Sequence, residues 1–146
     1  MPRPSWLESG LVLAVVDTGP LYAVADADDD DHERCTKALA SPAYRLVIPA
    51  LVVAETTYLV GTRLGARAEA AFLRSLVDLD VEAPAADEWS RIAELVDRYR
   101  DFPLGGTDAS VVSLAERLDT DLVITLDRRH FSAVRPRHRK TLRLLP

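Results

Sequence analysis

Cysteine is almost absent from this chain of 146 residues, because Cys35 is the only one. A lone cysteine excludes an internal disulfide and suits a reducing cytoplasm, where we expect the protein to reside. Long apolar runs are also missing, so we predict no membrane-spanning segment. Residues 1–10 lack the apolar stretch of a secretory signal, and we expect them to form a flexible lead-in to a single domain at residues 11–146.

An excess of positive charge, the usual sign of a protein that holds nucleic acid by charge alone, is missing as well. Lysine and arginine number 18 against 23 aspartates and glutamates, which gives a formal net charge of −5. The charges are unevenly distributed: residues 26–33 are strongly acidic, whereas residues 128–146 hold several arginines and no acid. The distribution of charge is therefore more informative than its sum.

Apolar residues make up 48% of the chain and follow two kinds of spacing. Continuous valine-rich runs at residues 11–16 and 121–126 predict buried parallel strands. Shorter strands are predicted at 45–48, 79–82 and 142–145. Helices are predicted at 18–25, 32–39, 49–63, after residue 66, 84–99 and 107–118. Strands that alternate with helices predict an α/β fold with a mostly parallel sheet.

Four carboxylates lie where the pattern is otherwise apolar. Asp17 and Asp127 each follow a predicted strand. Asp108 stands in the first turn of a predicted helix, and Glu55 has a leucine four residues before it and another four residues after it. Burying an unpaired carboxylate costs several kcal/mol or forces it to take up a proton. Four such acids therefore require a positive partner, and a divalent metal ion is the simplest one.

The predicted fold offers one place where these acids can meet. In open α/β sheets, ligands bind in the crevice outside the carboxyl ends of the strands, which Asp17 and Asp127 both follow. The positive end of a helix accommodates Asp108, and Glu55 can project into the same space. An oxygen-rich pocket prefers Mg²⁺ or Mn²⁺ to zinc. Magnesium retains several waters, one of which can become the hydroxide that attacks a phosphodiester.

Each acid also has an ordinary interpretation. Asp17 and Asp127 can be turn residues, Asp108 an acid at a helix start, and Glu55 the partner of an arginine. Nucleophilic chemistry with histidine has little support, because the three histidines lie in polar segments without an evident partner. A phosphotransfer domain with Asp17 as acceptor is disfavoured, because Gly19 stands where a haloacid-dehalogenase-type phosphatase has its second aspartate.

The segments that hold the four acids resemble the PIN-domain ribonucleases, and within them the VapC-like toxins of bacterial toxin–antitoxin pairs. The matching segments are residues 15–21 (VVDTGPL), 48–55 (IPALVVAE), 103–118 (PLGGTDASVVSLAERL) and 124–131 (ITLDRRHF). They occur in the family's order and span nearly all of the chain beyond residue 10. The resemblance implies a three-layer α/β/α sandwich around a mostly parallel sheet of about five strands.

The resemblance also implies hydrolysis of RNA that depends on Mg²⁺, for which Mn²⁺ can substitute. Asp17, Glu55 and Asp108 match the family's acidic triad, and Asp127 matches a fourth acid that is more variable. All four are therefore implied as catalytic. Asp17 and Asp108 are implied as metal ligands, Glu55 as a ligand that can act through water, and Asp127 as an additional one.

Several neighbouring side chains have roles that the sequence leaves open. Thr18 and Thr107 adjoin the acids and can either orient them or cap helices. Arg128 and Arg129 flank Asp127 and are the best placed for RNA phosphates. The basic C-terminal stretch can equally be a solvated surface or an antitoxin contact. Trp89, at a helical core spacing, is expected to face the core.

The resemblance favours a toxin that cleaves RNA and inhibits translation and growth when it is free of its antitoxin. The expected partners are therefore RNA, a cognate antitoxin and a second copy of the chain in a homodimer, without a membrane. One alternative is a PIN nuclease of RNA processing that is not toxic, and another is a PIN-like module that only binds. The retained acids argue against the binding module.

Overall fold

The computed structural model describes residues 10–146, so the predicted lead-in lies, except for Gly10, outside the described residues. Five strands form one sheet in the order β3-β2-β1-β4-β5, and every neighbouring pair is parallel. The strands are β1 (Val12–Val16), β2 (Tyr44–Pro49), β3 (Asp80–Glu82), β4 (Leu122–Ile124) and β5 (Arg143–Leu145). This confirms the predicted parallel sheet of about five strands.

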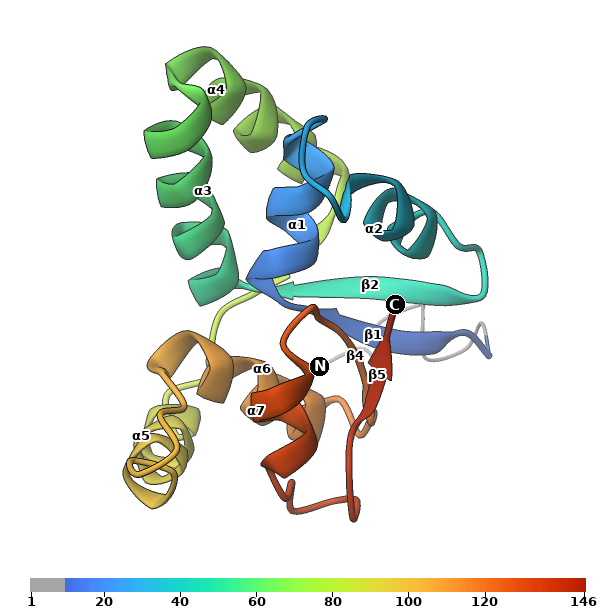
Figure 1. Cartoon of the computed structure of the whole chain (residues 1–146). Helices are drawn as coiled ribbons and strands as arrows, with labels where there is room; N and C mark the ends of the chain where they lie inside the picture. The colour runs from blue at the N-terminus through green and yellow to red at the C-terminus, as the bar shows by residue number, and fades with distance from the viewer. Residues whose placement is uncertain (1–9) are drawn as a thin grey trace.

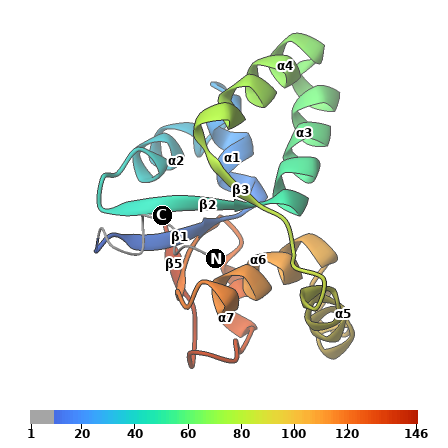
Figure 2. The same ribbon diagram turned by 180° about the vertical axis from the view of Figure 1, so that it is seen from behind.

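Helices cover both faces of the sheet and make a three-layer α/β/α sandwich, as predicted (Figure 1). Helices α1 to α4 lie on one side and α5 to α7 on the other, and the view from behind agrees (Figure 2). Their bounds are α1 (Thr18–Ala25), α2 (His32–Leu39), α3 (Ala50–Leu64), α4 (Ala66–Ser75), α5 (Glu88–Arg98), α6 (Gly106–Arg117) and α7 (Arg128–Ala133), with a 3-10 turn η2 (Leu76–Asp78).

The order of the strands reverses between β1 and β4. From β1 the chain builds outward through β2 and β3, and it then crosses to the other side of β1 to form β4 and β5. The backbone N–H of Asp17 donates to the carbonyl of Ile124 at 2.9 Å, so the pairing of these strands continues past the end of β1. Such a switch point is where open α/β sheets hold their ligands.

The core explains why the two central strands read as continuous apolar runs. Val15 and Val16 of β1 and Val123 and Ile124 of β4 have no exposed surface, because helices pack on both faces of the sheet. In a smaller cluster, the buried Phe72 of α4 packs against side chains of α1 and α3. The break predicted after α3 is at Gly65, whose φ of 94° is a conformation that favours glycine.

Several predicted boundaries differ from the structure. Pro49 ends β2 and caps α3 rather than opening that helix. Helix α6 begins at Gly106 with Gly105 as its N-cap, so Thr107 is not the cap. The six-residue α7 was not predicted, because the length and spacing of so short a helix leave little periodic signal.

Two predicted apolar faces were also wrong in part. Trp89 of α5 is 52% exposed, and the helix buries Arg91, Ile92 and Leu95 instead. Val77 was expected on the apolar face of the helix after residue 66, but it is 85% exposed. Helix α4 ends at Ser75, and Val77 lies in the 3-10 turn η2, where the spacing of an α-helix no longer applies. In residues 10–146, no helix combines the length and apolar character needed to cross a membrane.

Candidate active site

All four predicted acids line one hollow of about 520 Å³ at the carboxyl ends of β1 and β4. The lining residues are Asp17, Thr18, Gly19, Glu55, Leu59, Asp108, Leu126 and Asp127. They come from α1, α3, the start of α6 and the segment after β4. The convergence inferred from the strand ends is therefore present in the folded chain. We call this hollow the acidic cleft.

Asp17 is the most buried acid of the cleft, with 5% of its surface exposed. Burial above all, with smaller contributions from the charges of Asp108 and Glu55, raises its pKa from 3.8 to about 6. A hydrogen bond of 2.8 Å from the Thr125 hydroxyl to Asp17 Oδ2 opposes this rise. The site therefore holds a carboxylate whose negative charge is costly unless a cation lies beside it.

The raised pKa of Asp17 makes the stability of the metal-free protein depend on pH. The carboxyl binds its proton more tightly in the folded chain, so stability is lost as the pH rises from 3.8 through about 6. Asp17→Asn removes this titration and can still accept the Thr125 hydrogen bond. At pH 7.5 we expect metal-stripped Asp17→Asn to be more stable than wild type by up to about 3 kcal/mol, from about 1.4 kcal/mol per pKa unit.

Urea unfolding of both proteins at pH 7.5 and at pH 4 measures this difference. The advantage of Asp17→Asn should shrink towards pH 4, where Asp17 is protonated in the folded chain. An advantage of equal size at both values would mean that packing, and not ionisation, is responsible.

Asp108 and Glu55 occupy different depths of the cleft. Asp108, in the first turn of α6, is half-buried, and burial followed by the charges of Asp127 and Glu55 raises its pKa. Glu55 is exposed, so its apolar neighbours on α3 do not bury it. Its place on α3 nevertheless brings it to the mouth of the cleft.

Asp127 caps α7 and is paired with a histidine. Its Oδ1 accepts the backbone N–H of His130 at 3.0 Å, and Nδ1 of the His130 ring lies 2.8 Å from Oδ2. The expectation that the histidines lack partners was therefore wrong, since the rings of His32 and His138 also contact backbone carbonyls. His130 fixes the orientation of Asp127 at the edge of the cleft.

The hydroxyl of Thr125 connects two of the acids. It donates to Asp17 at 2.8 Å and accepts the backbone N–H of Asp127 at 2.9 Å. Thr125 is 1% exposed and follows directly after β4. The prediction missed this residue, although a single polar side chain in the run 122–126, two places before an acid, was a usable signal.

Of the other predicted residues, only Thr18 lines the cleft. Its hydroxyl is buried and has no hydrogen-bond partner within residues 10–146, and Asp17 rather than Thr18 is the N-cap of α1. Thr107 is the second residue of α6, and its carbonyl accepts from Ser110 at 2.6 Å. The alternative that these threonines cap helices is thus wrong for both. Arg128 and Arg129 lie just beyond Asp127, at the start of α7.

The donor atoms of the cleft suit a hard cation. All four acids offer carboxylate oxygens, and the buried Thr18 hydroxyl adds an unpartnered oxygen. In the described part of the chain, however, no group of three His, Cys, Asp or Glu side chains is arranged so that it could hold a metal ion. Ions that retain part of their water shell suit such a site better than ions that need a complete set of protein ligands.

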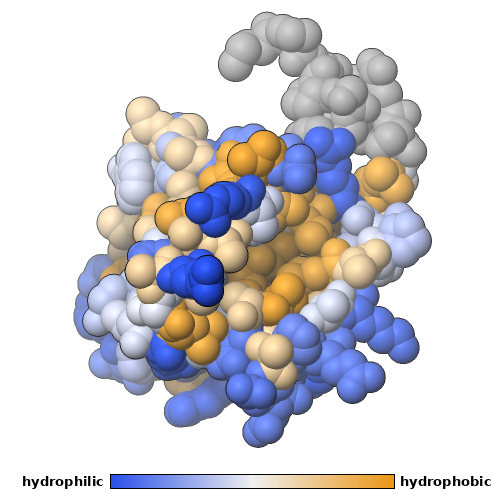
Figure 3. Space-filling model, turned by 90° about the horizontal axis from the view of Figure 1, so that it is seen from above, coloured by the Kyte–Doolittle hydropathy of each residue, from blue (hydrophilic) through white to orange (hydrophobic). Residues whose placement is uncertain are grey.

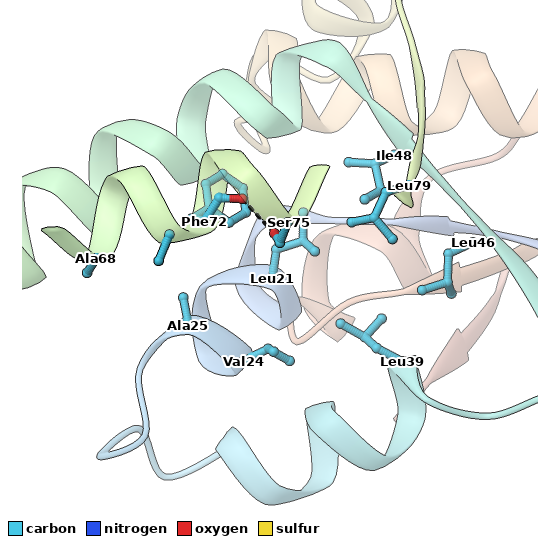
Figure 4. A pocket seen from close by; sticks show the side chains of 11 residues that line it. Leu21, Val24, Ala25, Leu39, Leu46, Ile48, Ala68, Phe72, Ser75 and Leu79 are labelled. Carbon is cyan, nitrogen blue, oxygen red and sulfur yellow. Dashed lines mark hydrogen bonds between the residues drawn. The ribbon is translucent and has the colours of Figure 1, made fainter. Parts of the chain in front are cut away.

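A second hollow, which we call the apolar groove, has a volume of about 460 Å³. It is lined by side chains of α1, α2, β2 and α4, with no charged residue among them. The view from above shows hydrophobic side chains within a hollow edged by hydrophilic ones (Figure 3), and the close-up shows how they face one another (Figure 4). The lining residues are Leu21, Val24, Ala25, Leu39, Leu46, Ile48, Ala68, Ala71, Phe72, Ser75 and Leu79.

Comparison with known structures finds the same fold in a toxin and in toxin–antitoxin complexes from three bacteria. The crystal structure of Mycobacterium tuberculosis VapC20, titled a Sarcin-Ricin loop cleaving toxin, superimposes with a TM-score of 0.71 at 23% identity, over 75% of this chain and 86% of that one. VapBC2 of Rickettsia felis, solved with a promoter DNA fragment, gives 0.68 at 17% identity over 92% and 100%. A toxin–antitoxin complex of Klebsiella pneumoniae gives 0.62 at 17% identity over 83% and 92%.

Comparison of sequences identifies the family. The model of the PIN domain matches residues 14–135, which include all four acids of the cleft. Ribonuclease VapC26 of Mycobacterium tuberculosis is 43% identical over 124 residues, which are 84% of this chain and 92% of that protein. This confirms the resemblance found in the sequence. The chain therefore belongs to the PIN-domain family, among the VapC ribonucleases.

Proposed function

We propose that this chain is an endoribonuclease that requires a divalent metal ion and acts as the toxin of a toxin–antitoxin pair. The observation that carries the proposal is the acidic cleft, where Asp17, Glu55, Asp108 and Asp127 meet at the switch point of the sheet. The likeness to Ribonuclease VapC26 supports RNA as the substrate. Complete retention of the acids argues against a module that only binds. The homodimer stays a prediction.

The acids of the cleft fit Mg²⁺ or Mn²⁺, and the burial of each acid suggests how it would contact the ion. Asp17 and Asp108, the two acids with raised pKa, would hold the ion, and the exposed Glu55 would contact it through water. The bound ion would supply an activated water and offset the charge that develops on the phosphate. Thr125 and His130 keep the carboxylates of Asp17 and Asp127 oriented toward the cleft before RNA arrives.

Sequencing of RNA ends tests the proposal. The purified protein is incubated with total bacterial RNA in Mg²⁺, in Mn²⁺ and in EDTA. We expect discrete new 5′ ends with either metal and none in EDTA. Absence of cleavage with both metals contradicts the nuclease, whereas cleavage that persists in EDTA contradicts only the metal requirement.

Thr125 is expected to matter for activity although its hydroxyl does not reach the open surface of the cleft. Thr125→Val preserves the shape of the side chain but removes the hydrogen bonds to Asp17 and Asp127. We expect cleavage to fall by about 10- to 100-fold, the usual cost of losing a residue that orients a metal ligand. Thr125→Ser, which keeps the hydroxyl, should recover most of the rate. Equal rates for the valine and serine variants would contradict this role.

The apolar groove supports the antitoxin part of the proposal. Its lining carries no charge, and one of the lining side chains, Val24 of α1, is exposed. An apolar patch rimmed by polar residues is typical of a surface that another protein covers. The two toxin–antitoxin structures with this fold are consistent with such a partner. We propose that an amphipathic segment of the antitoxin occupies the groove.

A charge placed in the groove should separate antitoxin binding from catalysis. Val24 lines the groove and is 37% exposed, so Val24→Glu adds a charge there without opening the core. We expect antitoxin affinity to fall by about tenfold or more, because the carboxylate must lose its water on binding, while RNA cleavage stays unchanged. Val77→Glu, at an 85% exposed position outside the groove, is the matched control. Equal binding by the two variants would place the antitoxin elsewhere.

A further inference from the structure

Most of the positive charge in the C-terminal stretch is already engaged within the protein. The sequence presents this stretch as a basic surface, but five of its six arginines bind carboxylates or backbone carbonyls. The pairs are Arg128 with the carbonyls of Leu144 and Pro146, Arg135 with that of Ser132, Arg137 with Glu94, Arg139 with Asp119 and Arg143 with Asp121. These arginines therefore have limited capacity to bind a further anion.

Arg129 is the exception among the arginines of this stretch. Its side chain is exposed and makes no hydrogen bond or ion pair with any other residue of 10–146. Its guanidinium instead lies over the ring of Phe102, 5.0 Å from the ring centroid. A guanidinium stacked in this way keeps its N–H groups available at its edge.

A chain of contacts fixes Arg129 beside the acidic cleft. Phe102 stands in the loop before α6, and its ring centroid is 4.7 Å from that of His130. His130 in turn contacts the carboxylate of Asp127, which lines the cleft. The stack thus places a cation with unoccupied donors on the flank of a site that is otherwise negative. We call Phe102, Arg129 and His130 the flanking stack.

A polyanion approaching four carboxylates is repelled unless a cation stands nearby. We propose that Arg129, held over Phe102, binds an RNA phosphate adjacent to the one that is cleaved. The proposal rests on the nuclease function and names the contact that brings RNA to the cleft. Phe102 acts as a positioning residue, because stacking limits the conformations that the long arginine side chain would otherwise lose on binding.

The steady-state kinetics of RNA cleavage test this contact. The probe is a short fluorescent RNA that spans a cut site mapped by end sequencing with the wild-type protein. For Arg129→Gln we expect KM to rise by about tenfold, the usual value of one charge-assisted contact, with kcat changed by less than about twofold. The slope of log KM against log salt should become shallower by roughly 0.7, the value for one contact to single-stranded nucleic acid.

Two further variants separate a phosphate contact from a general loss of charge. Arg139→Gln removes the same charge from the same basic stretch, but Arg139 borders a different hollow, which is lined by residues 11–13 at the start of β1 and residues 118–121 before β4. It should leave KM and the salt slope unchanged. Phe102→Leu should raise KM and leave kcat in place, and Phe102→Tyr, which restores an aromatic ring, should recover the wild-type KM.

The outcomes distinguish this inference from the proposed function. Wild-type protein that cleaves no RNA overturns the nuclease and this contact together. Cleavage by wild type, with Arg129→Gln equal to Arg139→Gln, overturns the contact alone. Unchanged RNA kinetics combined with weaker inhibition by the antitoxin would assign Arg129 to the protein partner and would likewise overturn the phosphate contact.

Discussion

Replacing Asp17 with asparagine is expected to slow metal-dependent RNA cleavage by about 10²- to 10⁴-fold, which corresponds to the several kcal/mol that a bound metal contributes. Asp17 is the most buried acid of the cleft, and Thr125 holds its second oxygen. Asparagine keeps the size and the hydrogen bond but offers the metal no charge. Single-turnover cleavage of an RNA with a mapped cut site, with Mg²⁺ in excess, measures the loss.

The matched control is Asp30→Asn, which removes one negative charge from the exposed acidic loop between α1 and α2. It should cleave at the wild-type rate. Because metal-stripped Asp17→Asn is expected to be more stable than metal-stripped wild type at neutral pH, we do not expect unfolding to cause the loss of activity, and urea unfolding in the assay buffer checks this. Wild-type cleavage by Asp17→Asn would remove Asp17 from the metal site and would contradict the mechanism.

Arg91→Ala is expected to destabilise the protein by about 3–5 kcal/mol, the cost of leaving one member of a buried ion pair without its partner. Arg91 is 8% exposed and binds both oxygens of Glu116, at 2.9 and 2.8 Å. Burial alone would raise the pKa of Glu116, but hydrogen bonds from Arg91 and the backbone of Arg137 lower it. Loss of Arg91 leaves this buried carboxylate with the Arg137 contact alone. Urea unfolding at pH 7.5 measures the change.

An exposed ion pair at the end of α5 provides a control for the buried pair of Arg91. Arg100 and Asp97 form an ion pair with more than two thirds of each side chain exposed, so Arg100→Ala should cost less than about 1 kcal/mol. The pair of Arg91 and Glu116 joins α5 to α6, the helix that carries Asp108. Equal losses for the two variants would show that the buried pair contributes no more than a surface one.

The strands and the four acids were predictable because each left a local pattern in the sequence. β1 and β4 are buried on both faces, so they read as uninterrupted apolar runs. Parallel pairing brings the carboxyl ends of these strands to the same edge, which was sufficient to place Asp17 beside Asp127. The resemblance to the PIN family then matched Asp17, Glu55 and Asp108 to the acidic triad and Asp127 to a more variable fourth acid.

The parts that were not predicted depend on contacts between residues far apart in the chain. The Thr125 hydroxyl reaches Asp17 across 108 positions, and no local spacing reveals that bond. The apolar neighbours of Glu55 pointed to burial, but the side chain is exposed where it lines the cleft. The engagement of the basic C-terminal arginines likewise depends on acids supplied by α5 and by the turn before β4.

The bond between Thr125 and Asp17 also has a consequence for the order in which the protein is made. Thr125 is synthesised 108 residues after Asp17, together with the neighbouring β4 and Asp127. A nascent chain that ends before this point has three of the four acids but lacks the strand that brings them together with the fourth. The acidic cleft is therefore incomplete until β4 and the segment after it have been synthesised.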